Sequence, residues 1–227
     1  MDTTVHSATA DSREPDGAEG NERLTAMTGA VLLVLLAVEG FTILRIGRLL
    51  TLHFFLGMLL IGPVALKAGS VSYRFTRYYG GSQPYRAKGP PQPLLRVLGP
   101  VNLVLTASVF GTGIMLAVTG PSYAGPSEWL QLHRLSFIAW FAAMVIHVLA
   151  YLPRLPRLLA AEARGVSLSA GETELAPVPA VRRHARRAAR VLGGRGTRVA
   201  LLTASLLAGL IIALLTVHLA GRWELGG

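Results

Sequence analysis

The sequence predicts an all-α integral membrane helical bundle with five transmembrane helices. Two observations support this fold class: 52% of the 227 residues are apolar whereas 15% are charged, and the apolar residues are gathered into long runs. Crossing a hydrocarbon layer of about 30 Å takes roughly 20 apolar residues at a rise of 1.5 Å each. Helix is the predicted state, because the alternation of barrel strands is absent and an isolated strand cannot satisfy its backbone in lipid.

Five runs have the length of membrane spans. They cover residues 24–44, 49–66, 97–118, 129–152 and 199–219. Only Arg45-Ile46-Gly47-Arg48 separates the first two runs, and the fourth stops at Pro153 and Pro156, since proline disrupts a continuing helix. The first four runs are predicted to form a four-helix core, to which the fifth adds one C-terminal helix.

These spans divide the chain into four segments. Residues 1–23 contain six acidic side chains, so they are predicted to be a disordered cytoplasmic tail rather than a signal peptide. Residues 24–152 form the four-helix core, residues 153–197 a basic cytoplasmic loop, and residues 198–227 the fifth helix with a short outer tail. Five arginines lie between Val181 and Leu192, where two interpretations stay open: a surface helix on anionic lipid, or a solvated loop.

Basic residues are concentrated on alternate connections. Residues 67–96 hold six basic residues and no acidic one, and residues 154–198 hold ten arginines against three glutamates. Positively charged loops stay in the cytoplasm. We therefore expect a multi-pass protein of the cytoplasmic membrane, surrounded by lipid, with its N-terminus inside and its C-terminus outside. The same rule accounts for the net charge of +10, so nucleic acid is not an expected partner.

The chain contains no cysteine. This excludes disulfides, thiolate-bound iron–sulfur clusters and covalently attached c-type haem. A metal or cofactor must therefore depend on histidine, carboxylate, methionine or lysine. The sequence also lacks a nucleotide-binding loop, a flavin fingerprint and an HExxH motif, so an electron-transfer subunit is expected rather than a stand-alone enzyme.

Four of the six histidines lie inside predicted spans: His53, His133, His147 and His218. Ionisable residues in a membrane are costly and are functional candidates by default. His133 and His147 are 14 residues apart, which places them on nearly one helix face and roughly 21 Å apart along the axis. His53 lies near the start of the second helix, which runs parallel to the fourth, so it falls at about the depth of His133. One imidazole from each of two parallel helices can clamp a haem iron from both sides.

The second helix reads LTLHFFLGMLLIGPVALK and the fourth reads LQLHRLSFIAWFAAMVIHVLAYLP. In topology and histidine spacing, residues 24–152 resemble the four-helix cytochrome b superfamily: the di-haem membrane subunits of bacterial respiratory dehydrogenases and hydrogenases, and ferric-reductase-like proteins. That resemblance implies a bacterial inner-membrane protein in which His53 and His133 bind the iron of the outer haem b. It also implies that His147 provides one ligand of an inner haem.

The sequence departs from this family at the fourth ligand position. The residue 14 positions after His53 is Lys67, whose amine must lose a proton before it can ligate iron. The alternative is that Lys67 reaches the cytoplasmic interface and caps the second helix. One haem b is therefore expected, and a second depends on whether Lys67 serves as a ligand.

Small and basic residues are expected near the outer haem. Gly40 and Gly113 fall at about the depth of His53 and His133, where a porphyrin needs close backbone approach. Three arginines at the outer end are either partners for the haem propionates or ordinary interfacial arginines; these are Arg45, Arg48 and Arg134.

Two further ionisable residues lie near the same end. Glu39 is expected either to pair with Arg45 or Arg48, or to carry protons beside a quinone. His218 is either a replacement haem ligand or an interfacial histidine.

Two functional hypotheses follow. The first is a b-type cytochrome that carries electrons through haem b, as a subunit or partner of a redox enzyme, with quinone as a further candidate partner. The second is a non-redox membrane scaffold, assembly factor or small transporter without haem, whose histidines form hydrogen bonds between helices or bind substrate or metal. The visible spectrum of the purified protein distinguishes them.

Overall fold

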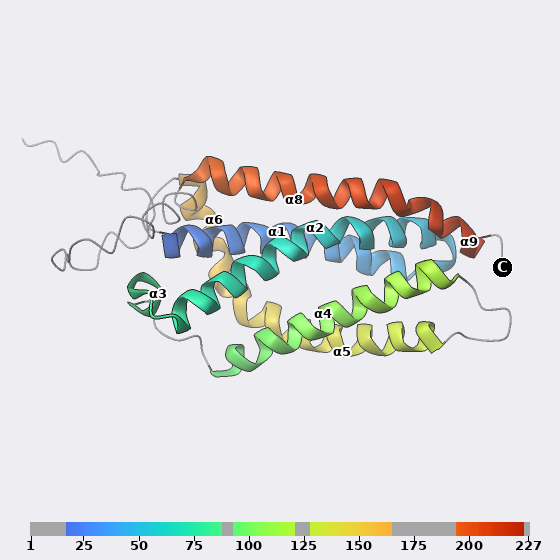
Figure 1. The fold of residues 1–227 in the computed structure, drawn as a ribbon, viewed down its shortest axis with the longest axis horizontal. Coiled ribbons are helices and arrows are strands. Elements are labelled where there is room, and N and C mark those ends of the chain that lie inside the picture. Colours follow the sequence, from blue (N-terminus) through green and yellow to red (C-terminus); the bar gives the residue numbers. More distant parts are fainter. Residues whose placement is uncertain (1–16, 88–92, 121–127, 165–193, 225–227) are drawn as a thin grey trace, which may run out of the picture.

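The computed structural model describes residues 17–87, 93–120, 128–164 and 194–224. These residues form helices and no strand, and five of the helices are long and apolar enough to cross a membrane (Figure 1). The predicted fold class is therefore confirmed. The arginine-rich segment between Val181 and Leu192 lies outside the described residues, as do His6 and His184.

Two helical hairpins and a fifth long helix make up the bundle. Helices α1 (Gly17–Ile43) and α2 (Ile46–Tyr79) form the first hairpin, and α4 (Pro93–Thr119) and α5 (Glu128–Tyr151) form the second. Helix α8 (Arg195–Thr216) continues through η2 (Val217–Ala220) into α9 (Gly221–Glu224). The short elements α3 (Gln83–Ala87), η1 (Leu152–Arg154) and α6 (Leu155–Arg164) complete the described fold.

The two ends of the bundle carry different elements. Helices α3 and α6 lie at one end, and α9 lies at the other (Figure 1). We call these the α6 end and the α9 end. Helices α2 and α5 both begin at the α9 end, so they run parallel, as predicted for the two histidine-bearing helices.

Helix α8 packs closely along α2. A Cβ atom at Gly62 would collide with the carbonyl oxygen of Ser205, and one at Gly209 would collide with the carbonyl oxygen of Leu59. Glycine on both helices thus lets the two backbones touch, which is how membrane helices gain packing energy without a hydrophobic driving force. Helices α4 and α5 pack mainly on each other and contact the remainder less.

The outer faces of the long helices are apolar. Phe41, Val104 and Leu135 are among the large apolar side chains that are exposed in the isolated chain. Helix α5 has no buried residue. Such a surface would aggregate in water and is explained by contact with lipid.

Helix α1 begins earlier than the sequence predicted. Residues 17–23 are helical, although the expected disordered tail extends to residue 23. The polar side chains of this segment are not solvated, because Glu19, Asn21 and Arg23 are buried against neighbouring elements. Residues 1–16 lie outside the described residues.

Helix α2 ends later than predicted, and this corrects the placement of Lys67. The helix continues to Tyr79 and stops at Gly80 and Gly81, where Gly81 has a φ of 85°. Gly69 is tolerated within the helix, and the aromatic and basic residues from Tyr73 to Tyr79 contain no glycine or proline. Lys67 therefore lies inside α2 and cannot cap its end.

Candidate functional site

His53 is held against helix α1. It lies in the second turn of α2, and its Nδ1 atom is 3.0 Å from Oε1 of Glu39 and 2.9 Å from Oγ1 of Thr42. The side chain of Glu39 is 13% exposed and that of His53 is 23% exposed. Glu39 thus pairs with His53, which corrects the expectation that it pairs with Arg45 or Arg48.

His133 is held in the same way by the second hairpin. It lies in the second turn of α5, and its Nδ1 atom is 3.0 Å from Oγ1 of Thr112 on α4. A Cβ atom at Gly113 would lie 3.2 Å from Cε1 of His133. The predicted glycine therefore does border a predicted histidine, and any larger residue would press on the imidazole ring.

The hydroxyl groups define which nitrogen of each ring carries the hydrogen. Thr42 donates its hydroxyl hydrogen to the carbonyl oxygen of Glu39 at 2.6 Å, and Thr112 donates to that of Ser108 at 2.7 Å. A hydroxyl has one hydrogen, so toward the histidine it can only accept. With both hydroxyls donating to these carbonyls, Nδ1 of each ring would be the N–H donor, and Nε2 of His53 and His133 would keep its lone pair for a metal.

The two histidines come from different hairpins but from the same depth. Each lies within two turns of the α9 end of its helix. Haem-ligating histidines commonly donate their second ring N–H to a protein oxygen, which fixes the ring and its tautomer. The structure thus places two imidazoles, each held at Nδ1 by a threonine hydroxyl, at the same end of the bundle.

The inner site is less well formed. Nζ of Lys67 donates a hydrogen bond of 2.7 Å to the carbonyl oxygen of Thr25 on α1. Gly29 of the same helix leaves room for this amine, because a Cβ atom at that position would lie 2.8 Å from Nζ. Lys67 and His147 lie close enough to interact electrostatically. His147 packs against Tyr151 with ring centroids 4.8 Å apart, and its buried Nδ1 atom has no hydrogen-bond partner among the described residues. A lysine that donates to a backbone carbonyl does not fit an iron ligand, so the structure favours a bridge between α1 and α2.

The remaining predicted site residues lie toward the α9 end of the bundle. A Cβ atom at Gly40 would meet no described atom within 4 Å. Three exposed arginines, namely Arg45, Arg48 and Arg134, lie at the α9 end near the histidine pair. His218 lies in η2 at the same end.

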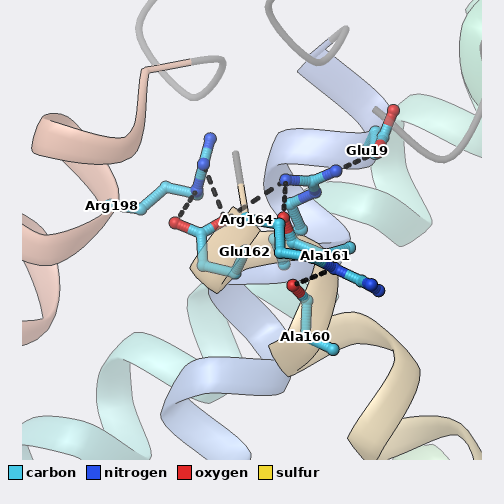
Figure 2. A network of polar contacts seen from close by, with 7 residues as sticks. Glu19, Ala160, Ala161, Glu162, Arg164 and Arg198 are labelled. Carbon is cyan, nitrogen blue, oxygen red and sulfur yellow. Dashed lines mark hydrogen bonds and ion pairs between the residues drawn. The ribbon is translucent and has the colours of Figure 1, made fainter. Parts of the chain in front are cut away.

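Sequence reasoning missed a buried ion network at the α6 end (Figure 2). The carboxylate of Glu162 on α6 accepts two hydrogen bonds from the guanidinium of Arg198 on α8, at 2.7 Å and 3.3 Å. The same carboxylate lies 3.6 Å from the guanidinium of Arg23 on α1. Arg23 also forms an ion pair of 2.6 Å with Glu19. Glu19 and Arg23 were expected in the disordered tail, Glu162 in the basic loop, and Arg198 in the segment of the fifth helix. The available signals were the i, i+4 spacing of Glu19 and Arg23 and the isolated acid among the arginines.

The described residues contain no group of three or more histidine, cysteine or acidic residues that could hold a metal ion. A haem needs only two axial donors, because the porphyrin supplies the other four. Comparisons with protein-family models, with curated proteins and with solved structures gave no match. The chemistry of the paired histidines is therefore the basis of a functional assignment.

Proposed function

We propose that the protein is a b-type cytochrome that carries electrons through one haem b in the membrane. Nε2 of His53 and Nε2 of His133 would provide the two axial ligands. The observation that carries the proposal is that Nδ1 of each ring lies at hydrogen-bond distance from a threonine hydroxyl of the other helix of its hairpin, 2.9 Å for His53 and 3.0 Å for His133. Nε2 is then the nitrogen of each ring that remains for iron. When bound, haem supplies one-electron chemistry, while the protein supplies ligands, orientation and a dry environment.

The residues around the pair have distinct tasks in this proposal. Thr42 and Thr112 hold the two imidazoles in the Nε2-ligating tautomer. Gly113 leaves room beside His133. Arg45, Arg48 and Arg134 are the cations available to the haem propionates at the α9 end, where charge-assisted hydrogen bonds would orient the group.

The proposed role requires redox partners. The sequence has no site for a flavin, a nucleotide or an iron–sulfur cluster, so electrons must arrive from and leave to another protein or a quinone. From the positive charge of the loops we infer that the α6 end faces the cytoplasm and that the α9 end, with the histidine pair, lies near the outer face of a cytoplasmic membrane. We limit the proposal to one haem, because Lys67 is bonded to α1.

A scaffold without haem is the second candidate. It is favoured by the observation that each histidine already bonds to the other helix of its own hairpin, His53 to α1 and His133 to α4. Interhelical hydrogen bonds of this kind stabilise membrane bundles by about 0.6 to 2 kcal/mol each. In that case both rings would be structural.

Haem content after substitution separates the two candidates. His53→Ala and His133→Ala should each abolish the low-spin haem spectrum of the purified protein. His218→Ala is the matched control, because it removes an imidazole at the same end of the bundle and should leave the spectrum unchanged. Full haem content in both His53→Ala and His133→Ala would refute the ligand assignment.

A further inference from the structure

A carboxylate next to one of the two proposed ligands makes the site asymmetric. His53 contacts the acidic side chain of Glu39, whereas His133 contacts uncharged groups, the hydroxyl of Thr112 and the backbone of Val109. Glu39 is inside a predicted span, where an unsupported charge is costly. Its position therefore calls for an explanation beyond packing.

The structure shows that Glu39 is directed to His53. Its Oε1 atom is 3.0 Å from Nδ1 of His53 and 3.6 Å from the position that a Cβ atom would take at Gly57, one turn further along α2. The absence of a side chain at Gly57 thus gives the carboxyl group access to the imidazole. Its other oxygen, Oε2, is buried and has no hydrogen-bond partner among the described residues.

The nearby arginines do not share this carboxyl group. Arg45 and Arg48 are exposed, and the ion pair of Glu39 given by the described residues is the one with His53. The hydrogen bond therefore acts mainly on the imidazole. A carboxylate that accepts from Nδ1–H draws the hydrogen toward itself and makes Nε2 a stronger electron donor.

We propose that Glu39 is a positioning residue that acts through His53 to lower the reduction potential of the haem. This inference rests on the proposed function. A stronger donor and a nearby negative charge stabilise the ferric state, which carries one more positive charge than the ferrous state. Electron release to the acceptor becomes more favourable, and the two axial ligands become inequivalent.

The test is a redox titration of the purified haem protein, with Glu39→Gln compared with the wild type. Glutamine keeps the size and the acceptor oxygen but removes the charge. We expect the ferrous state to be favoured about tenfold more than in the wild type, which raises the midpoint potential by about 59 mV for a one-electron couple. The low-spin electron paramagnetic resonance g values should move as well, since they report the electron donation of the axial imidazoles.

Glu128→Gln is the matched control. It removes the same charge from an exposed acid at the start of α5, five residues before His133, so a long-range charge effect would appear in both variants. Equal shifts in both variants, or an unchanged potential in Glu39→Gln, would overturn the proposal. A larger shift in Glu39→Gln would support it.

A second variant covers the case in which Glu39→Gln fails to retain haem. Glu39→Asp keeps the charge but withdraws the carboxylate by one methylene, which weakens the hydrogen bond to His53. A potential raised above the wild type supports the proposal, and an unchanged potential overturns it. A wild-type protein without haem would refute the proposed function itself. A wild-type protein that carries haem, but whose potential does not respond to substitution of Glu39, would refute only the role of Glu39.

Discussion

Removal of the Glu162 carboxylate should destabilise the α6 end of the bundle strongly. This carboxylate meets two guanidinium groups, Arg198 at 2.7 Å and Arg23 at 3.6 Å. The three side chains are between 0% and 7% exposed. Loss of one partner from a buried ion pair costs about 3 to 5 kcal/mol, because the remaining charges stay buried. In Glu162→Ala the folded-to-unfolded ratio should therefore fall by roughly a hundred- to a few thousand-fold.

Equilibrium unfolding in mixed detergent micelles measures this effect. Glu128→Ala is the control, since it removes an exposed acid from the first turn of another helix, and exposed charges contribute about 0 to 1 kcal/mol. A double-mutant cycle with Arg198→Ala should show that the two losses are not additive. A loss below about 1 kcal/mol in Glu162→Ala, or strict additivity in the cycle, would refute the view that this network binds α6 to the bundle.

Three further predictions test the packing, the lysine and the orientation. Gly62→Leu should separate α2 from α8 and lower the free energy of unfolding by at least about 2 kcal/mol, since the new side chain would collide with the backbone of α8. Gly40→Leu is the control: a Cβ atom at Gly40 would meet no described atom within 4 Å, so this variant should lose far less stability. Lys67→Met should leave the haem content unchanged and cost about 1 kcal/mol for the lost hydrogen bond to α1; loss of half of the haem would instead make Lys67 a ligand. Because the chain has no native cysteine, single cysteines report the orientation: in intact cells a membrane-impermeant maleimide should label Glu128→Cys but not Gln83→Cys, and the reverse pattern would invert the topology.

The long apolar runs were sufficient to predict the membrane fold. Hydrophobic length is a local property, and all five spans were placed within a few residues at most ends. The ends of α1 and α2 were misplaced because the surrounding polar residues look like solvent-exposed loops. Arg23 and Lys67 are in fact satisfied by residues far away in sequence, Glu162 and Thr25.

The candidate site could be predicted only in outline. The spacing of His133 and His147 and the parallel course of two helices identify the histidine pair from the sequence. The supporting Thr42 and Thr112 could not be identified in this way, because threonine is common in membrane helices and its partner depends on helix rotation. Glu39 was recognised as unusual, but its pairing with His53 depends on the side-chain direction and on the open space at Gly57.

We propose that one haem b lies between His53 and His133. A reduced-minus-oxidised visible spectrum of the purified protein, with haem quantified as the pyridine haemochrome, is the test of this proposal. We expect a sharp six-coordinate b-type spectrum and one haem per chain. A colourless protein, purified intact from haem-replete cells, would contradict it and would leave the two histidines as hydrogen-bonded supports of the helical hairpins.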